Sequence, residues 1–204
     1  MRIGIEAQRL FRIKKHGMDM VVLELIRELQ TIDNYNQYYI YVAPGEDRCI
    51  EETANFKIRI IGSNFYPYWE QKTLPNAVKA DRCDILHCTS NTAPLSIHIP
   101  LVVTLHDIIF MEKKPYAILT GNGTNYQKMG NLYRRWNVPK VVKQCSKLIT
   151  VSESEKVRLC DYFNLNQNKV EAVYNGVSAH FKPITDKVKL DEFRSRYALP
   201  ERYF

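Results

Sequence analysis

Two side chains that often carry chemistry, His106 and Asp107, directly follow an apolar run at residues 100–105. A continuous apolar run of this length is typical of a strand buried in a parallel sheet. A histidine at the end of such a strand can lie at the mouth of a cleft, where its neutral ring exchanges one hydrogen bond with a ligand hydroxyl. Asp107 would then orient neighbouring groups. The alternative is that His106 only caps the strand end.

Three further groups of polar residues follow runs of strand length, at 6–17, 89–91 and 152–153. Ligands of open parallel sheets bind outside the carboxyl ends of the strands, so we expect these groups to meet at one edge. Gly17 precedes an apolar helical pattern, and its backbone could approach an anion at the helix N-terminus. Lys14, Lys15 and His16 would raise the positive potential there.

The elements that must position these residues follow from the hydrophobic pattern. Apolar runs of strand length occur at 3–7, 38–43, 58–61, 85–87, 101–105, 148–151 and 170–174. Residues 18–30 carry one apolar stripe at helical spacing, and Ser152 with Glu155 matches a capping box that starts another helix. Strands alternating with helices predict an α/β fold with a doubly wound, mainly parallel, Rossmann-like sheet. We expect irregular loops at 64–75 and 112–131.

The pattern predicts a domain at residues 1–177. The turn signal at 175–177 is followed by a segment, 178–204, that reads as a linker and one amphipathic helix. We expect this segment to lead into a second domain.

Composition and missing motifs narrow the function. No apolar run is long enough to span a membrane, and the first residues enter a strand without a signal sequence, so we expect a cytoplasmic protein. The five cysteines lack CxxC spacing, which favours free structural thiols over a disulfide or metal framework. GxGxxG, GxxxxGK[ST], GxSxG and Asp-x-Asp patterns are missing, which disfavours dinucleotide enzymes, P-loop NTPases, α/β-hydrolases and an obvious metal clamp.

The net charge of +7 is concentrated in two stretches, 9–15 and 134–147. Each is either a contact for an anionic partner or a solvated face. The stretch 131–147 mixes Leu132, Tyr133 and Trp136 with five cations, so it could rest on an anionic membrane or form a core helix with solvated cations. No nucleic-acid-binding motif accompanies the charge, and we expect no nucleic-acid partner.

Five motifs taken together resemble the amino-terminal half of family 4 retaining glycosyltransferases, which have the GT-B fold. They are MRIGIEAQRLFRIKKHGMDMVVLELIREL (1–29), DILHCTSNTAPL (84–95), PLVVTLHDIIF (100–110), LITVSESEKVRL (148–159) and VYNGVSAHFKP (173–183). The resemblance implies transfer of a sugar, with retention, from a nucleotide-diphosphate sugar to a glycan or lipid-linked acceptor. It implies no cofactor and no required metal. It also implies that the chain alone is inactive, because the donor grip belongs to a second half.

The resemblance also implies site roles. His106 and Asp107 take the catalytic positions; Gly17, Lys15 and Ser152 lie on the donor phosphate side; Glu6, Arg9, Thr89 and Asn91 lie on the acceptor side. The chain departs from the family pattern at Asp19 and Met20, because the family often has a second glycine and an arginine in this loop. An acid beside a phosphate site is unfavourable unless it caps the helix. A different class of function also stays open, namely a stand-alone module that binds a carbohydrate or a lipid headgroup without catalysis.

Overall fold

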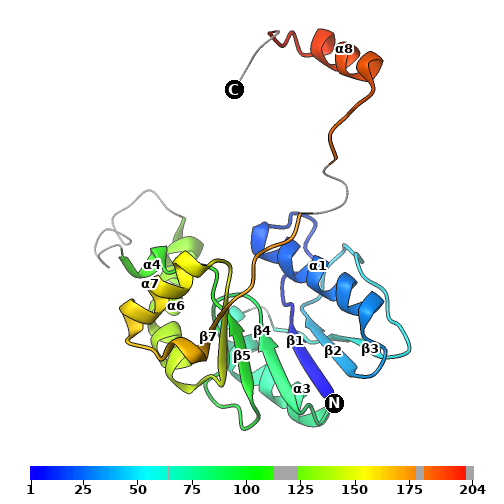
Figure 1. The fold of residues 1–204 in the computed structure, drawn as a ribbon. Coiled ribbons are helices and arrows are strands. Elements are labelled where there is room, and N and C mark those ends of the chain that lie inside the picture. Colours follow the sequence, from blue (N-terminus) through cyan, green and yellow to red (C-terminus); the bar gives the residue numbers. More distant parts are fainter. Residues whose placement is uncertain (64, 113–123, 178–181, 201–204) are drawn as a thin grey trace. The chain divides into compact units, whose positions relative to one another are not determined.

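A computed structural model describes residues 1–63, 65–112, 124–177 and 182–200. These residues form two compact units, residues 1–174 and residues 175–204 (Figure 1). The first unit holds the sheet and every candidate site residue.

In the residues that the structure describes, seven strands form one sheet in which every pair is parallel. They are β1 (Arg2–Glu6), β2 (Gln37–Val42), β3 (Phe56–Ile60), β4 (Ile85–Cys88), β5 (Leu101–Thr104), β6 (Lys147–Thr150) and β7 (Val170–Ala172). Their order is β3-β2-β1-β4-β5-β6-β7. The predicted strands and the Rossmann-like fold class are confirmed, with strand ends shifted by one or two residues.

Helices lie on both faces of the sheet. Among the described residues of the first unit they are α1 (Gly17–Ile32), α2 (Tyr66–Tyr68), the π-helical turn η1 (Trp69–Thr73), α3 (Leu74–Ala80), α4 (Ile109–Glu112), α6 (Asn125–Gln144), α7 (Glu153–Phe163) and the 3₁₀ turn η2 (Gln167–Lys169). The expectation of an irregular loop at 64–75 is wrong, because α2, η1 and the start of α3 occupy most of it. The predicted loop at 112–131 is also too long: α6 begins at Asn125, and residues 113–123 lie outside the described part.

Two apolar clusters hold these layers together. One joins α1, through Val22, Leu23 and Ile26, to the β1–β3 side of the sheet. The other lies on the opposite face and joins α3, α6 and α7 to the strands from β4 to β7. The two ends of the sheet therefore carry their main helical cover on opposite faces, as right-handed crossovers in both directions require.

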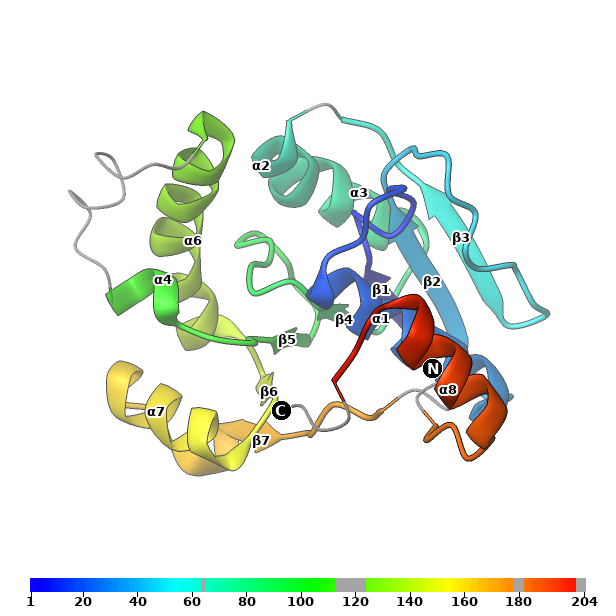
Figure 2. The ribbon, with the colours of Figure 1, turned by 90° about the horizontal axis from the view of Figure 1, so that it is seen from above.

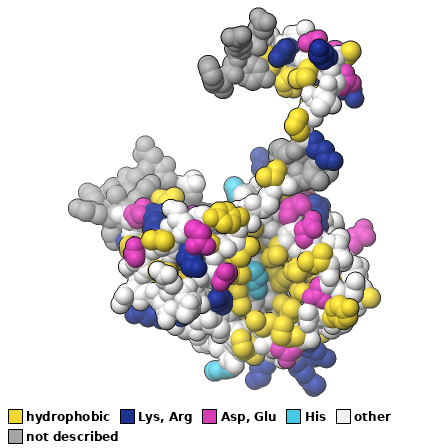
Figure 3. All heavy atoms as spheres, in the orientation of Figure 1, with side chains coloured by type: hydrophobic (Ala, Val, Ile, Leu, Met, Phe, Trp, Pro, Cys, Tyr) yellow, Lys and Arg dark blue, Asp and Glu magenta, His cyan; other side chains and the backbone are white. Residues whose placement is uncertain are grey.

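One face of β4–β6 is only half covered. Burial alternates along each strand: Leu86, Val103 and Leu148 are fully buried, while Ile85 and Ile149 are partly exposed. The partly exposed residues lie on the same face as α1, and hydrophobic side chains gather there over β1 and β4 in Figure 3. The continuous apolar runs in the sequence predict that helices cover both faces of these strands, but the structure covers one face only in part.

The second unit contains α8 (Lys187–Arg196). The Asp186 carboxylate caps this helix by accepting from the backbone of Val188 at 3.0 Å. In the described part of the chain, no helix is both long and apolar enough to cross a membrane.

Candidate functional site

The candidate site lies where the order of the strands reverses. β1 and β4 are neighbours, but the chain continues from β1 towards β2 on one side and from β4 towards β5 on the other. Loops that leave two such strands diverge, which opens a crevice at their carboxyl ends. Figure 2 shows α1, α2, α6 and α7 arranged around the ends of β1, β4 and β5.

Buried hydrogen bonds join the ends of β1 and β4. The Thr89 hydroxyl donates to the Glu6 carbonyl at 2.8 Å, and the Gln8 backbone N–H donates to Glu6 Oε1 at 2.9 Å. Glu6 is 1% exposed, and this burial raises the pKa of its carboxyl. Glu6 and Thr89 thus fix the two loops relative to each other, with little surface left for a ligand.

His106 is held by the loop that follows β4. Its backbone N–H donates to Asn91 Oδ1 at 2.8 Å, and its Nε2 lies 3.0 Å from the Thr89 carbonyl oxygen. A carbonyl only accepts, so Nε2 carries the hydrogen and Nδ1 stays a hydrogen-bond acceptor. Burial lowers the pKa of His106, which keeps the ring neutral near pH 7. A ring of this kind can accept a hydrogen bond from a sugar hydroxyl.

Asn91 adopts a left-handed backbone conformation, with φ of 71°. We expect Asn91→Ala to lower the free energy of unfolding by about 1 kcal/mol more than Asn91→Gly, because both lose the bond to His106 but only alanine is strained at this φ. Urea denaturation followed by circular dichroism measures the difference. A glycine variant that is the less stable of the two would contradict this reading of the loop.

The start of α1 supplies a capped, partly neutralised helix N-terminus. Asp19 Oδ2 accepts from the His16 backbone N–H at 2.9 Å, and Asp19 Oδ1 pairs with Arg9 Nε at 3.0 Å. The unfavourable acid of the sequence is therefore a helix cap with a cationic partner. Apart from the adjoining residues and the backbone of α1 itself, no atom of the described part of the chain lies within 4 Å of a side-chain carbon placed at Gly17, so the space beside the first turn is open.

Two predicted donor-side residues have other partners. The Lys15 ammonium forms an ion pair with Asp47 and donates to the Arg12 carbonyl at 3.2 Å. The Ser152 hydroxyl accepts from the Glu155 backbone N–H at 3.1 Å and so caps α7. The predicted contacts of Lys15 and Ser152 with a donor phosphate stay predictions.

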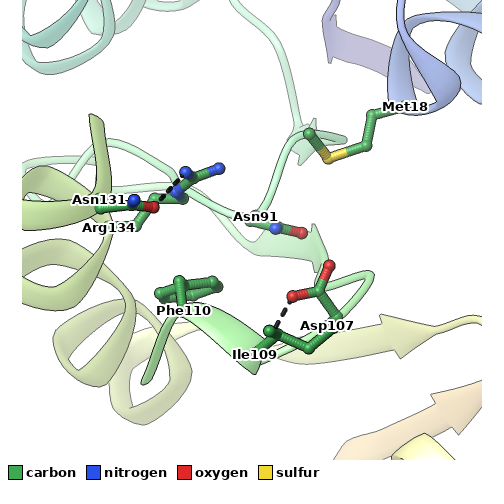
Figure 4. Close-up of a pocket in the computed structure, with 7 residues that line it drawn as sticks. All are labelled: Met18, Asn91, Asp107, Ile109, Phe110, Asn131 and Arg134. Atoms are coloured by element: carbon green, nitrogen blue, oxygen red, sulfur yellow. Dashed lines mark hydrogen bonds between the residues drawn. The ribbon is translucent and has the colours of Figure 1, made fainter. Parts of the chain in front are cut away.

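Asp107 lines a cavity of about 270 Å³ at the same edge of the sheet (Figure 4). Its Oδ1 accepts from the Ile109 backbone N–H at 3.0 Å, which fixes the carboxylate at the start of α4. Within the described part of the chain, the lining residues come from four segments: Met18, Asn91, Asp107, Ile109, Phe110, Asn131 and Arg134. Asn91 thus touches both His106 and this cavity.

Glu70, in η1, is a buried carboxylate that the sequence reasoning missed. It is 0% exposed and accepts hydrogen bonds from Tyr66 at 2.7 Å, from Gln71 at 3.0 Å, and from Thr92 and Tyr133. Burial raises its pKa to about 7, against the lowering effect of these bonds. Thr92 follows Asn91 in the loop after β4, so its hydrogen bond to Glu70 helps to hold this loop in place.

The side chains of Gln71 and Asn137 complete this support. Gln71 Oε1 accepts from the Leu95 backbone N–H at 2.9 Å, and Asn137 exchanges hydrogen bonds with the backbone of Ala93 at 2.9 and 3.2 Å. The loop 89–95 is therefore fastened to η1 and α6 as well as to Glu6 and His106. A site loop held in this way is preorganised for ligand binding.

A Rossmann-like sheet with its polar loops at the reversal of strand order is the architecture of nucleotide- and sugar-binding α/β domains. The family model of Glycosyltransferase Family 4 matches residues 16–181. The chain therefore belongs to Glycosyltransferase Family 4. A search of curated proteins gave no match.

Solved glycosyltransferase structures share the fold. WaaG, a glycosyltransferase involved in lipopolysaccharide biosynthesis, superposes with a TM-score of 0.63 at 10% identity, covering 98% of this chain and 52% of WaaG. HepE of Anabaena, in complex with UDP-glucose, superposes with a TM-score of 0.59 at 14% identity, covering 100% of this chain and 51% of HepE. The chain thus spans about half the length of these GT-B enzymes.

Proposed function

We propose that this chain is the acceptor-side domain of a retaining glycosyltransferase that moves a sugar from a nucleotide-diphosphate sugar to a glycan or lipid-linked acceptor. The observation that carries the proposal is the convergence of His106, Asn91 and the open N-terminus of α1 on one edge of the sheet. The family membership supports glycosyl transfer as the reaction class.

In this proposal, the residues contribute positioning and electrostatic stabilisation. The N–H groups at the start of α1 face the donor diphosphate, since a helix N-terminus favours negative charge. His106 Nδ1 accepts from a hydroxyl of the transferred sugar, and Asp107 binds hydroxyls in the adjoining cavity. Glu6 and Thr89 act through the loops that they join.

Residues 178–204 are, in this proposal, a linker and the start of a second domain that holds the nucleotide sugar. HepE is described in complex with UDP-glucose, which makes UDP-glucose the first donor to test. We place the enzyme in the cytoplasm. Contact with an anionic membrane surface near a lipid-linked acceptor is supported by α6, which exposes Met129, Leu132 and Trp136. The Lys140 ammonium lies 3.9 Å from the centre of the Trp136 ring and adds a positive charge there.

The test is transfer of labelled sugar by the complete gene product from a panel of nucleotide sugars that begins with UDP-glucose. The proposal expects a glycosylated product with the donor's anomeric configuration, and no turnover by residues 1–204 alone. If the complete gene product binds glycans but leaves every nucleotide sugar intact, the protein is a binding module and the proposal is wrong.

A further inference from the structure

The cavity beside His106 has walls of distinct chemistry. At one wall, Arg134 Nη2 donates to Asn131 Oδ1 at 2.6 Å, and the guanidinium lies 5.3 Å from the centre of the Phe110 ring. These two contacts hold the cation in one orientation at the cavity surface (Figure 4). The opposite wall carries the Asp107 carboxylate.

The hydrogen-bonding capacity of the walls is unequal. Asn91 uses its Oδ1 to accept from the His106 backbone, which leaves its Nδ2 hydrogens as donors. Arg134 and the amide of Asn131 also donate, so donors gather away from Asp107. A ligand that matches these walls accepts strongly at one end and offers hydroxyl hydrogens at the other.

Size and apolar surface narrow the ligand further. A cavity of about 270 Å³ is at the small end of ligand sites, so it suits one sugar ring rather than an oligosaccharide. Met18, Ile109 and Phe110 add apolar surface. The C–H face of a pyranose can pack there, which a small free anion cannot do.

We propose that this cavity binds a pyranose that carries an anionic group, with the anion at Arg134 and ring hydroxyls at Asp107. This rests on the proposed function in one respect, because it makes the bound sugar the acceptor. The anion is a carboxylate, as in a uronic acid, or a phosphate, as in a sugar phosphate. Either forms charge-assisted hydrogen bonds with a guanidinium.

The test is a binding titration of the 204-residue chain, followed by amide NMR, with D-glucuronate, glucose 1-phosphate and methyl glucoside. We expect at least one anionic sugar to bind about tenfold or more tightly than the neutral one, with shifts at Asn91, Asp107 and Asn131. The two anionic probes distinguish carboxylate from phosphate. Equal binding of all three, or shifts elsewhere, would overturn the proposal.

Variants separate the cavity from general positive charge. Arg134→Gln should weaken binding of the anionic sugar about tenfold or more. Arg134→Lys should keep part of the affinity, because lysine keeps the positive charge. Lys143→Gln removes an exposed cation of the same helix that does not line the cavity, and it should bind as the wild type does. A loss in Lys143→Gln equal to that in Arg134→Gln would contradict the assignment. The titration involves no sugar transfer, so the binding proposal can fail while the proposed enzyme activity stands. Equally, the binding proposal can hold while the proposed enzyme activity fails.

Discussion

Glu70→Ala is expected to lower the free energy of unfolding by about 3 to 5 kcal/mol, because the change removes the acceptor that three hydroxyl groups share. These hydroxyls belong to Tyr66, Thr92 and Tyr133, and Glu70 itself is fully buried. Gln71 also donates to Glu70, but it keeps the Ala93 carbonyl as an acceptor. Urea denaturation at pH 8 measures the loss.

Two controls define what the Glu70 result means. Glu28→Ala removes an exposed glutamate and should change stability by about 0.5 kcal/mol or less. Glu70→Gln keeps the size of the side chain and part of its hydrogen bonding, so it should cost about 1 to 2 kcal/mol. If Glu70→Ala stays within about 1 kcal/mol of the wild type, the carboxylate does not hold the β4 loop.

A comparison of the wild type with Glu70→Gln also tests the charge state of Glu70. Its folded pKa, about 7, lies above the ordinary value of 4.5, so the folded state holds the proton more tightly than the unfolded chain. The stabilising effect of this proton is full below pH 4.5 and is lost as the pH rises through 7, by about 3 kcal/mol at most.

Other buried groups change stability with pH as well. The pKa of His87 is lowered to about 4 by burial, which makes stability rise with pH below 6.5. His87 is present in both proteins, so the difference between wild type and Glu70→Gln isolates Glu70. The wild type should therefore lose free energy of unfolding relative to Glu70→Gln as the pH rises from 5 to 8. A flat difference would contradict the raised pKa.

His106→Ala is expected to lower sugar transfer by the complete gene product about 100- to 1000-fold, since it removes a preorganised hydrogen-bonding group from the proposed sugar site. The ring is held at 3.0 Å from the Thr89 carbonyl, which orients Nδ1 for a hydroxyl. If His106 contacts the sugar most strongly in the transition state, the loss appears in kcat more than in KM.

His98 provides a matched control for His106. It is an exposed histidine in the loop before β5, at the opposite edge of the sheet. His98→Ala should leave transfer unchanged, and both variants should keep the far-ultraviolet circular dichroism of the wild type. If the two variants lose equal activity, or His106→Ala loses none, His106 only caps the strand.

The fold was predictable because its signals are local. Buried strands such as β5 appear as apolar runs between polar turns, and α1 shows its buried face as a stripe at helical spacing. Residues 66–75 are helical although two prolines favour a loop there, because Pro67 and Pro75 lie in the first turns of α2 and α3, where proline is tolerated. The sequence did hold a signal for the start of α6: Thr124 and Gln127 form a capping box.

The site was predictable only in part. Strand ends placed His106, Asn91, Thr89 and Glu6 at one edge, which the sheet confirms. Glu70 was not predictable, because only Tyr66 lies near it in the sequence, four residues earlier, while Thr92 and Tyr133 come from distant segments that the fold brings to it. The cavity at Arg134 arises in the same way from α1, α4, α6 and the β4 loop.

The central claim is that the ligand-facing groups of this family 4 domain gather at the carboxyl ends of β1, β4 and β5. A crystal structure of the complete gene product with UDP-glucose tests it most directly. We predict the diphosphate beside the backbone N–H groups of residues 17–19 and the glucose within hydrogen-bonding reach of His106. A nucleotide sugar bound at the opposite edge of the sheet, near His98 and Ser146, would contradict the claim.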